Sequence, residues 1–208
     1  MVKSADDELL ERLLRVRGPL LERAKVALGD HATRGAAVMP AWQRYEGVVW
    51  THLDPATLTP AQRSRLLIPS ALYGVNAGND EITDYRLTFK VALAPLGGLA
   101  NYWRPHLTAT LLATAGTFVS LLPREHESAI DVEALSEAGR FRRVRFTTAD
   151  GQGAAGHDAK AVKGHVARSI LRRGLGALPG WTWEGWTALP DGHDWTVMAP
   201  PPPRRPRK

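Results

Sequence analysis

A short apolar run, Leu66 to Ile68, is closed by a proline and followed by a loop that is rich in hydrogen-bonding side chains. Such a run is typical of a buried strand, and Pro69 marks where the strand ends and the chain must turn. Because loops held by a rigid scaffold are common places for functional sites, we expect one here. Ordinary turn formers beside an exposed Tyr85-Arg86 pair are the alternative. The polar side chains are Ser70, Tyr73, Asp80, Asp84, Tyr85 and Arg86.

Apolar periodicity and turn residues predict the other elements. Helices are predicted over residues 6–16, 19–29, 61–65, 99–112 and 158–173, with Thr59 capping the third and Pro105 interrupting the fourth. Strands are predicted at residues 48–50, 117–122, 142–148 and 195–198, and residues 88–94 are expected to be extended. At 208 residues, the chain is long enough for one domain or a tight pair of subdomains.

The first two predicted helices meet at Val16-Arg17-Gly18, and Pro19 opens the second one. This pattern resembles a helix-hairpin-helix, whose exposed backbone N–H groups can hold a phosphate without reading base sequence. A plain helical hairpin is the alternative.

The helix predicted over residues 158–173 has a core face with apolar residues at four-residue spacing. Lys160 and Lys163 lie three apart in its first turns, where the positive end of the helix dipole disfavours cations. A nearby anion would relieve this repulsion. The alternative is a solvated basic face that continues along the helix to Arg168, Arg172 and Arg173.

Two further patterns argue against nucleotide recognition. Gly151, Gly153 and Gly156 have the spacing of a dinucleotide-binding loop, but the strand before them is polar and no acidic residue lies between Asp158 and Glu184 to hold a ribose. We expect a hairpin turn at residues 150–151 and a returning edge at 154–157 instead. Four of the seven tryptophans fall within residues 181–195 beside acidic residues, which favours core packing or a lid over base stacking.

Composition excludes several classes of chemistry. Cysteine is absent, so the chain has no disulfide and no thiol nucleophile. The scattered histidines predict no metal site, and we expect no cofactor.

With no membrane segment and no targeting signal expected, we predict a cytoplasmic protein. Of the net charge of +6, the Pro/Arg tail at residues 200–208, which we expect to be disordered, supplies +4, so the body is only mildly basic.

Five segments, in this order and spacing, resemble successive signatures of the YaaA family. They are Arg44-Tyr45-Glu46-Gly47-Val48-Val49-Trp50, Ser70-Ala71-Leu72-Tyr73-Gly74, Asp84-Tyr85-Arg86-Leu87, Gly98-Leu99-Ala100-Asn101-Tyr102-Trp103-Arg104 and His157-Asp158-Ala159-Lys160-Ala161-Val162-Lys163-Gly164. The resemblance implies a single bacterial domain over residues 1–199 with an α+β fold, a mixed sheet flanked by helices and a helix-hairpin-helix-like element at 6–29. It also implies a positively charged cleft, binding of double-stranded DNA without sequence preference, and protection from peroxide by limiting damage from free iron.

By the same resemblance, the anion-facing residues are Arg17, Gly18, Arg86, Arg104, Lys160 and Lys163. Arginine supplies a planar fork and lysine a point charge, and both suit phosphate oxygens. The chain departs from the family in two places, since nothing before Asp6 resembles the family's first strand and loop, and Pro123 to Glu127 replaces a serine and a tyrosine. Both departures fall near the expected cleft.

Two other functions remain open. The first is an enzyme, or former enzyme, acting on a small phosphorylated or nucleotide-like ligand in the same cleft, because the residue mix is more varied than phosphate neutralisation needs. Its candidate catalytic residues are Ser70, Tyr73, Asp80, Tyr85, His157 and Lys160. The second is an interaction protein whose missing first strand leaves a sheet edge for a partner chain. We otherwise expect a monomer that binds double-stranded DNA or a small anion and no membrane.

Overall fold

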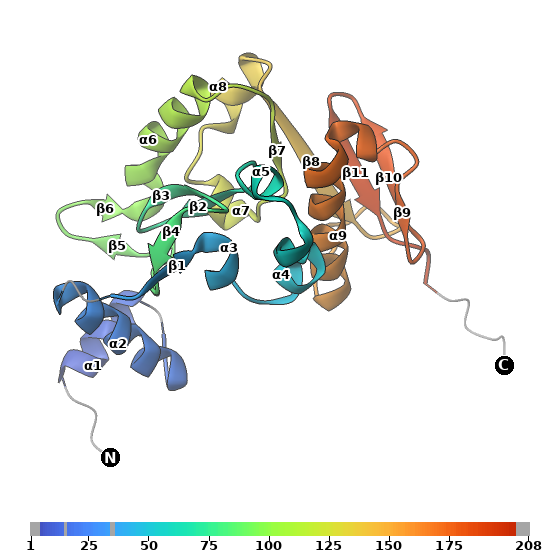
Figure 1. Cartoon of the computed structure of the whole chain (residues 1–208). Helices are drawn as coiled ribbons and strands as arrows, with labels where there is room; N and C mark the ends of the chain where they lie inside the picture. The colour runs from blue at the N-terminus through green and yellow to red at the C-terminus, as the bar shows by residue number, and fades with distance from the viewer. Residues whose placement is uncertain (1–4, 15, 34–35, 203–208) are drawn as a thin grey trace, which may run out of the picture. The chain divides into compact units, whose positions relative to one another are not determined.

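The computed structural model describes residues 5–14, 16–33 and 36–202 (Figure 1). Two compact units interleave along the chain. The first contains Met1–Arg44, Leu66–Ala115 and Leu122–Ala138, and the second contains Tyr45–Arg65, Gly116–Leu121 and Gly139–Lys208. A single domain over residues 1–199 therefore stays a prediction. Most of the tail predicted at 200–208 lies outside the described residues.

The first unit combines short helices with three two-stranded antiparallel sheets, β1-β4, β2-β3 and β5-β6. Its helices are α1 (Ala5–Leu14), α2 (Pro19–Thr33), α3 (Ala41–Arg44), α6 (Leu99–Ala113), α7 (Arg124–Glu127) and α8 (Val132–Glu137). Its strands are β1 (Val38–Pro40), β2 (Leu67–Ser70), β3 (Gly74–Ala77), β4 (Glu81–Thr83), β5 (Ala92–Leu93) and β6 (Gly97–Gly98).

Helices α1 and α2 form a hairpin with its own small core of Val16, Leu21 and Ala24. The turn at Gly18 has a φ of +55°, a left-handed conformation that favours glycine. The prediction that the second helix stops at Gly29 is wrong, since α2 continues to Thr33. Glycine is only a weak helix breaker, and here it lies inside the helix with a helical backbone.

Two prolines are accommodated where the sequence predicted interruptions. Pro69 lies inside β2, paired with Val75 across the hairpin, because each strand of a two-stranded sheet has a free edge where a missing N–H costs nothing. Pro105 lies inside α6, which runs unbroken from Leu99 to Ala113. Because Pro105 is exposed, the carbonyl that loses its helical bond can be hydrated.

The second unit is built on a five-stranded sheet in the order β7-β8-β11-β10-β9. Strand β8 pairs in parallel with β7 and β11, and the other pairs are antiparallel, so the sheet is mixed. The strands are β7 (Phe118–Ser120), β8 (Phe141–Thr147), β9 (Thr182–Trp183), β10 (Trp186–Asp191) and β11 (Asp194–Met198). The helices are α4 (Val48–Leu53), η1 (Pro55–Thr57), α5 (Pro60–Arg63), α9 (His157–Arg173) and η2 (Leu175–Ala177).

Helix α9 covers this sheet (Figure 1). Val162 and Val166 are fully buried and pack with Val197 of β11, as their four-residue spacing predicted. The loop before α9 bends back on β8, with Ala154 N–H donating to the Phe146 carbonyl at 2.8 Å. The expected turn is therefore present, but the returning edge predicted at 154–157 is not a strand, since only Gly153 and Ala154 pair with β8 and His157 already begins α9. Trp181 and Trp186 join the same core, so two of the clustered tryptophans serve packing.

The prediction of a strand at residues 48–50 is wrong, because these residues begin α4. Two valines and a tryptophan favour a strand locally, but α4 packs closely against α9 and burial decides the conformation. The approach depends on Gly164, since a Cβ there would lie 2.5 Å from the Val49 carbonyl oxygen. The predicted helix after Thr59 is confirmed as α5, with a capping box between Thr59 and Gln62.

The α+β class and the mixed sheet flanked by helices are confirmed. Within the described residues, no helix is both long enough and apolar enough to cross a bilayer.

Candidate functional site

The hairpin between β2 and β3 carries Ser70 at the end of its first strand, directly opposite Gly74. Ser70 is 1% exposed, and its Oγ accepts hydrogen bonds from the N–H groups of Leu72 at 3.2 Å and Tyr73 at 3.1 Å. This candidate catalytic serine therefore closes the turn with its hydroxyl group. Its buried oxygen is poorly placed to attack a substrate.

The same hairpin is fixed on α6 by an indole ring. Trp103 Nε1 donates to the Ala71 carbonyl at 2.8 Å, and the ring lies so close that a Cβ on Gly74 would be 2.7 Å from it. Because Gly74 also has a φ of +82°, only glycine fits this position without strain. The turn that presents Tyr73 is thus rigidly positioned.

Tyr73 and Tyr85, both predicted from the loop pattern, do meet. Their rings pack edge to face with centroids 5.7 Å apart. The Tyr73 hydroxyl lies 2.6 Å from Thr83 Oγ1 and accepts a bond from the Thr83 N–H at 3.2 Å. Thr83 was missed because a lone threonine in a strand carries no functional signal in the sequence. The three side chains form a partly exposed polar cluster.

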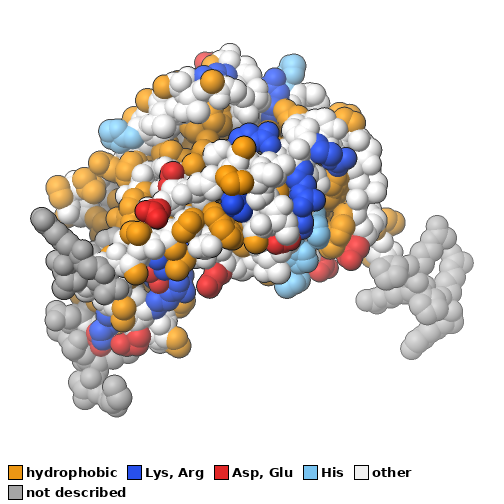
Figure 2. Space-filling view, in the orientation of Figure 1, with side chains coloured by type: hydrophobic (Ala, Val, Ile, Leu, Met, Phe, Trp, Pro, Cys, Tyr) orange, Lys and Arg blue, Asp and Glu red, His pale blue; other side chains and the backbone are white. Residues whose placement is uncertain are grey.

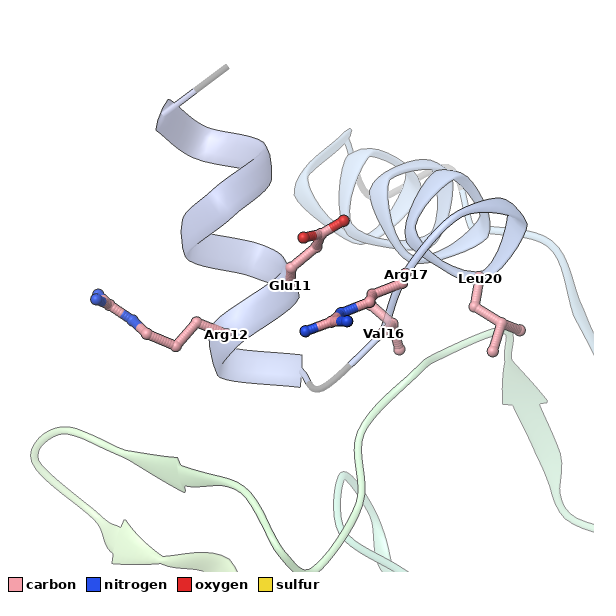
Figure 3. A pocket seen from close by; sticks show the side chains of 5 residues that line it. All are labelled: Glu11, Arg12, Val16, Arg17 and Leu20. Carbon is pink, nitrogen blue, oxygen red and sulfur yellow. The ribbon is translucent and has the colours of Figure 1, made fainter. Parts of the chain in front are cut away.

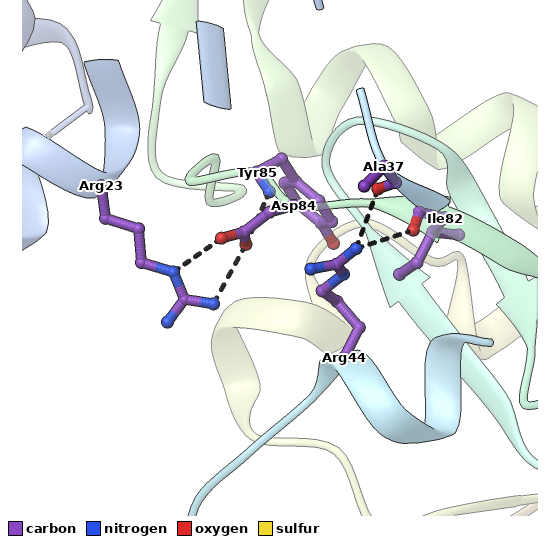
Figure 4. A network of polar contacts seen from close by, with 6 residues as sticks. All are labelled: Arg23, Ala37, Arg44, Ile82, Asp84 and Tyr85. Atoms are coloured by element: carbon purple, nitrogen blue, oxygen red, sulfur yellow. Dashed lines mark hydrogen bonds and ion pairs between the residues drawn. The ribbon is translucent and has the colours of Figure 1, made fainter. Parts of the chain in front are cut away.

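An ion pair connects the helical hairpin to this loop (Figure 4). Arg23 of α2 holds both carboxylate oxygens of Asp84, with Nε to Oδ2 at 2.6 Å and Nη2 to Oδ1 at 3.2 Å. Burial alone would raise the pKa of Asp84, but hydrogen bonding and charge from Arg23 hold this pKa below its ordinary value. Arg44 lies nearby and donates to the carbonyls of Ala37 and Ile82.

Arg86 and Arg104, two of the three arginines predicted as anion ligands in the first unit, differ in what they contact. Arg104 donates twice to the Ser128 carbonyl, at 3.0 and 2.9 Å, so it stabilises the end of α7. Arg86 is half-buried, and its Nε is buried with no hydrogen-bond partner among the described residues. A buried guanidinium donor without a partner is costly, which makes Arg86 the stronger candidate for a ligand contact.

Asp80 has a structural place as well. Its Oδ2 accepts from the Ala77 N–H at 2.7 Å in the turn between β3 and β4, and its carbonyl accepts from Ala41 at 2.7 Å. The carboxylate therefore fixes the turn by accepting from the backbone three residues before it.

The helical hairpin borders a groove of about 570 Å³ (Figure 3). Arg17 and the exposed Arg12 lie on its wall with one acid, Glu11. The N–H groups of Leu20 and Leu21 bond back to the carbonyls of Arg17 and Gly18. Because the first backbone donors of α2 are already used, an anion here would depend on the arginine side chains. The lining residues are Glu11, Arg12, Val16, Arg17 and Leu20.

In the second unit, His157 and Lys160 are exposed in the first turn of α9. Lys163 is half-buried, with its Nζ 5.3 Å from the centroid of the Phe146 ring. Basic side chains also gather over α5 and α9 (Figure 2). Arg168 and Arg172 of α9 both donate to Thr57 Oγ1, at 2.7 and 3.3 Å. Arg86 and Arg104 belong to the other unit, so a cleft shared with Lys160 and Lys163 stays a prediction.

Metal ligation by three or more side chains finds no support among the described residues, which contain no suitable group of His, Asp and Glu. The site residues thus divide into turn formers, Ser70 and Asp80, and side chains with exposed or unused polar groups. The second group contains Tyr73, Arg86, Arg17, His157 and Lys160. Tyr85 is half-buried and packs against Tyr73.

Comparison with known proteins identifies relatives over most of the chain. Residues 1–189 match the family described as peroxide stress protein YaaA. A UPF0246 protein of Phocaeicola vulgatus is 26% identical over 201 residues, which cover 86% of this chain and 76% of the relative. One from Streptomyces coelicolor is 34% identical over 67% of this chain and 55% of the relative, and one from Corynebacterium efficiens is 34% identical over 69% and 59%.

The matches with the Streptomyces and Corynebacterium efficiens proteins thus span less than two thirds of those relatives. The family match itself spans nearly the whole chain, from before the helical hairpin to β10. The chain therefore belongs to the YaaA (UPF0246) family.

Proposed function

We propose that this chain binds double-stranded DNA through its phosphates, without sequence preference, as part of a response to peroxide. The observation that supports this most is the exposed tip of the helical hairpin, where Arg12 and Arg17 line one groove in a member of the YaaA family. Arginine side chains bind phosphate oxygens with planar, charge-assisted hydrogen bonds, and such contacts carry no sequence information.

Further proposed phosphate contacts are Arg86 in the first unit and, in the second unit, the two lysines of α9. Lys160 is exposed in the first turn of α9, where the helix dipole favours an anion and disfavours a lysine. A bound phosphate would interact favourably with the helix dipole and would offset the repulsion between this dipole and Lys160. Each neutralised phosphate releases counterions from the DNA. A plot of the logarithm of the association constant against the logarithm of the salt concentration should therefore have a slope of about −0.9 per phosphate contact.

The test is fluorescence anisotropy with a short duplex of random sequence at several salt concentrations. An Arg12→Ala/Arg17→Ala double variant and a Lys160→Ala/Lys163→Ala double variant should each bind more weakly, with a smaller salt slope. Lys90→Ala is the matched control, since Lys90 is compensated by Glu125 at 2.7 Å. If both double variants bind like the wild type, or the wild type fails to bind at low salt, this proposal fails.

The peroxide role is tested in cells. Cells that lack this chain should survive a peroxide challenge less well, and the double variants should restore survival less than Lys90→Ala does. Equal rescue by all variants would separate the peroxide role from DNA binding.

One observation favours the second function, an enzyme or former enzyme acting on a small phosphorylated molecule. The Arg86 Nε is buried and finds no hydrogen-bond partner among residues 5–14, 16–33 and 36–202. Such a donor is better suited to a small acceptor that enters the protein than to a duplex that stays outside. Tyr73 and Tyr85 pack together in the same unit and would supply hydroxyl groups to such a ligand. Thermal stabilisation by inorganic phosphate or a nucleoside monophosphate, lost in Arg86→Met, would support this function over DNA binding.

A further inference from the structure

Two histidines face each other where α4 crosses α9. His52 is in the last turn of α4, and His165 follows the glycine that allows the two helices to approach. Their facing ring nitrogens, His52 Nδ1 and His165 Nε2, lie 3.0 Å apart. The residues are 113 positions apart in the sequence, so the fold brings them together.

A tryptophan restricts the orientation of both rings. The Trp183 ring lies against His165 with centroids 4.4 Å apart and an interplanar angle of 31°. It meets His52 edge to face at 6.2 Å. All three side chains are half-buried. The two nitrogens are therefore held near each other by packing as well as by their own hydrogen bond.

We propose that His52 Nδ1 and His165 Nε2 together bind one divalent transition-metal ion of the copper or nickel class. With metal–nitrogen bonds of about 2.0–2.1 Å, a nitrogen separation of 3.0 Å gives an angle at the metal of about 91–97°. Adjacent positions of a square-planar or tetragonal ion are 90° apart, and such geometry is typical of Cu²⁺ and Ni²⁺. A tetrahedral zinc ion would need the nitrogens about 0.3 Å further apart.

Charged groups and burial around the pair act on His165. Burial, the neighbouring His52 and the charge of Arg168 lower the pKa of His165, while Glu184 on the turn after β9 acts in the opposite direction. Arg168 is itself paired with Asp54 at 3.1 Å, which offsets its repulsion of a cation.

Proton balance is simple. In the hydrogen-bonded pair, one facing nitrogen carries the shared proton; when the metal binds, that ring takes its other tautomer, with the proton on the nitrogen that faces away. No net proton is released from the neutral pair. The protein supplies two ligands, because the described residues offer no group of three, and water completes the coordination. Binding should therefore be reversible and should weaken as acid protonates the imidazoles.

Isothermal titration of the tag-free full chain with CuCl₂ and with NiCl₂ tests this site. One ion should bind per chain, and His52→Gln or His165→Gln should lower the affinity at least tenfold. His193→Gln is the matched control, since His193 is exposed in the turn before β11, away from the pair. It should leave binding unchanged.

Wild-type protein provides a second readout in case either variant fails to fold. Paramagnetic Ni²⁺ should broaden the imidazole C–H resonances of His52 and His165 before those of any other histidine. Absence of saturable binding, equal binding by all variants, or broadening that begins at another histidine would show that the pair is a hydrogen bond and nothing more.

Discussion

Replacement of Gly164 by alanine tests whether the close crossing of α4 and α9 holds the second unit together. The new Cβ would lie 2.5 Å from the Val49 carbonyl oxygen, 2.7 Å from His52 Cβ and 2.8 Å from the Leu53 nitrogen. All three distances are below 3.0 Å, an approach that real Cβ atoms essentially never make. Two of the three atoms are backbone, so α4 as a whole must move to relieve the overlap.

The magnitude follows from two opposing effects. Overpacking costs roughly 1–3 kcal/mol, and contact with backbone places this site at the upper end. Alanine is better than glycine inside a helix by about 1 kcal/mol, which offsets part of the cost. We therefore expect a net loss of about 2 kcal/mol in the free energy of unfolding, or about 4–8 °C in Tm for a chain of this size.

Gly29→Ala is the matched control. Gly29 also lies inside a helix, α2, but a Cβ there meets nothing within 4 Å. The control should gain up to about 1 kcal/mol, because only helix propensity changes. Thermal melts and urea titrations of Gly164→Ala would follow tryptophan fluorescence, which reports mainly the second unit, where Trp50, Trp181, Trp183, Trp186 and Trp195 lie. Far-UV circular dichroism would follow both variants, because Gly29 lies on α2 of the first unit.

A Gly164→Ala protein as stable as the wild type, or stabilised like the Gly29 control, would refute the reasoning. It would mean that the two helices do not cross as closely as 2.5 Å requires.

Two further predictions concern ionisable groups. Arg23→Ala should cost about 1 kcal/mol at neutral pH, because the pair with Asp84 is bidentate but partly exposed. The effect should disappear as pH falls below 3.8 through the lowered pKa of Asp84, and urea midpoints of wild type and variant at pH 7 and pH 3 would show this. The pKa of His165 is lowered in the folded protein. Below pH 6.5 the unfolded chain therefore takes up the proton more readily than the folded one, so the free energy of unfolding should fall as the pH falls. His165→Gln, measured with a chelator present, should flatten this decline, and an unchanged slope would contradict the assignment.

Sequence periodicity predicted the elements whose pattern and packing agree. Helix α9 has apolar residues at four-residue spacing and buries them against the sheet, so pattern and structure coincide. The strand prediction for residues 48–50 failed because local pattern and packing disagree there. Their local preference for a strand was overridden by a helix contact that depends on Gly164, more than a hundred residues later.

In the candidate site too, sequence reasoning found neighbours on one loop but missed contacts between distant segments. Tyr73 and Tyr85 lie on one predicted loop, and sequence reasoning placed them together correctly. The partner of Asp84 could not be found this way, because Arg23 is 61 residues away on a helix that gives no signal for it. Ser70 and Asp80 looked catalytic because serine and aspartate serve both turns and active sites, and only their hydrogen bonds distinguish the two uses.

Substitution of Arg86 can distinguish a structural role from a ligand-binding role even before the ligand is identified. Its Nε is buried and has no hydrogen-bond partner within the described part of the chain, so in the free protein it carries a desolvation cost of about 1–3 kcal/mol that an acceptor on a ligand would offset. Arg86→Met keeps an apolar side chain that reaches the position of Nε and removes both the donor and the charge. If the donor is reserved for a ligand, the free variant should be as stable as the wild type or up to about 1 kcal/mol more stable, while binding of DNA or phosphate is lost.

Arg104→Met is the control for this comparison. Arg104 donates two hydrogen bonds to the Ser128 carbonyl, so its replacement should destabilise the free protein. Stability at a functional position is often sacrificed for binding, so opposite signs for the two arginines would mark Arg86 as the functional one. Equal destabilisation of both variants would mean that Arg86, like Arg104, serves the fold, and the case for an anion at this loop would then rest on other residues.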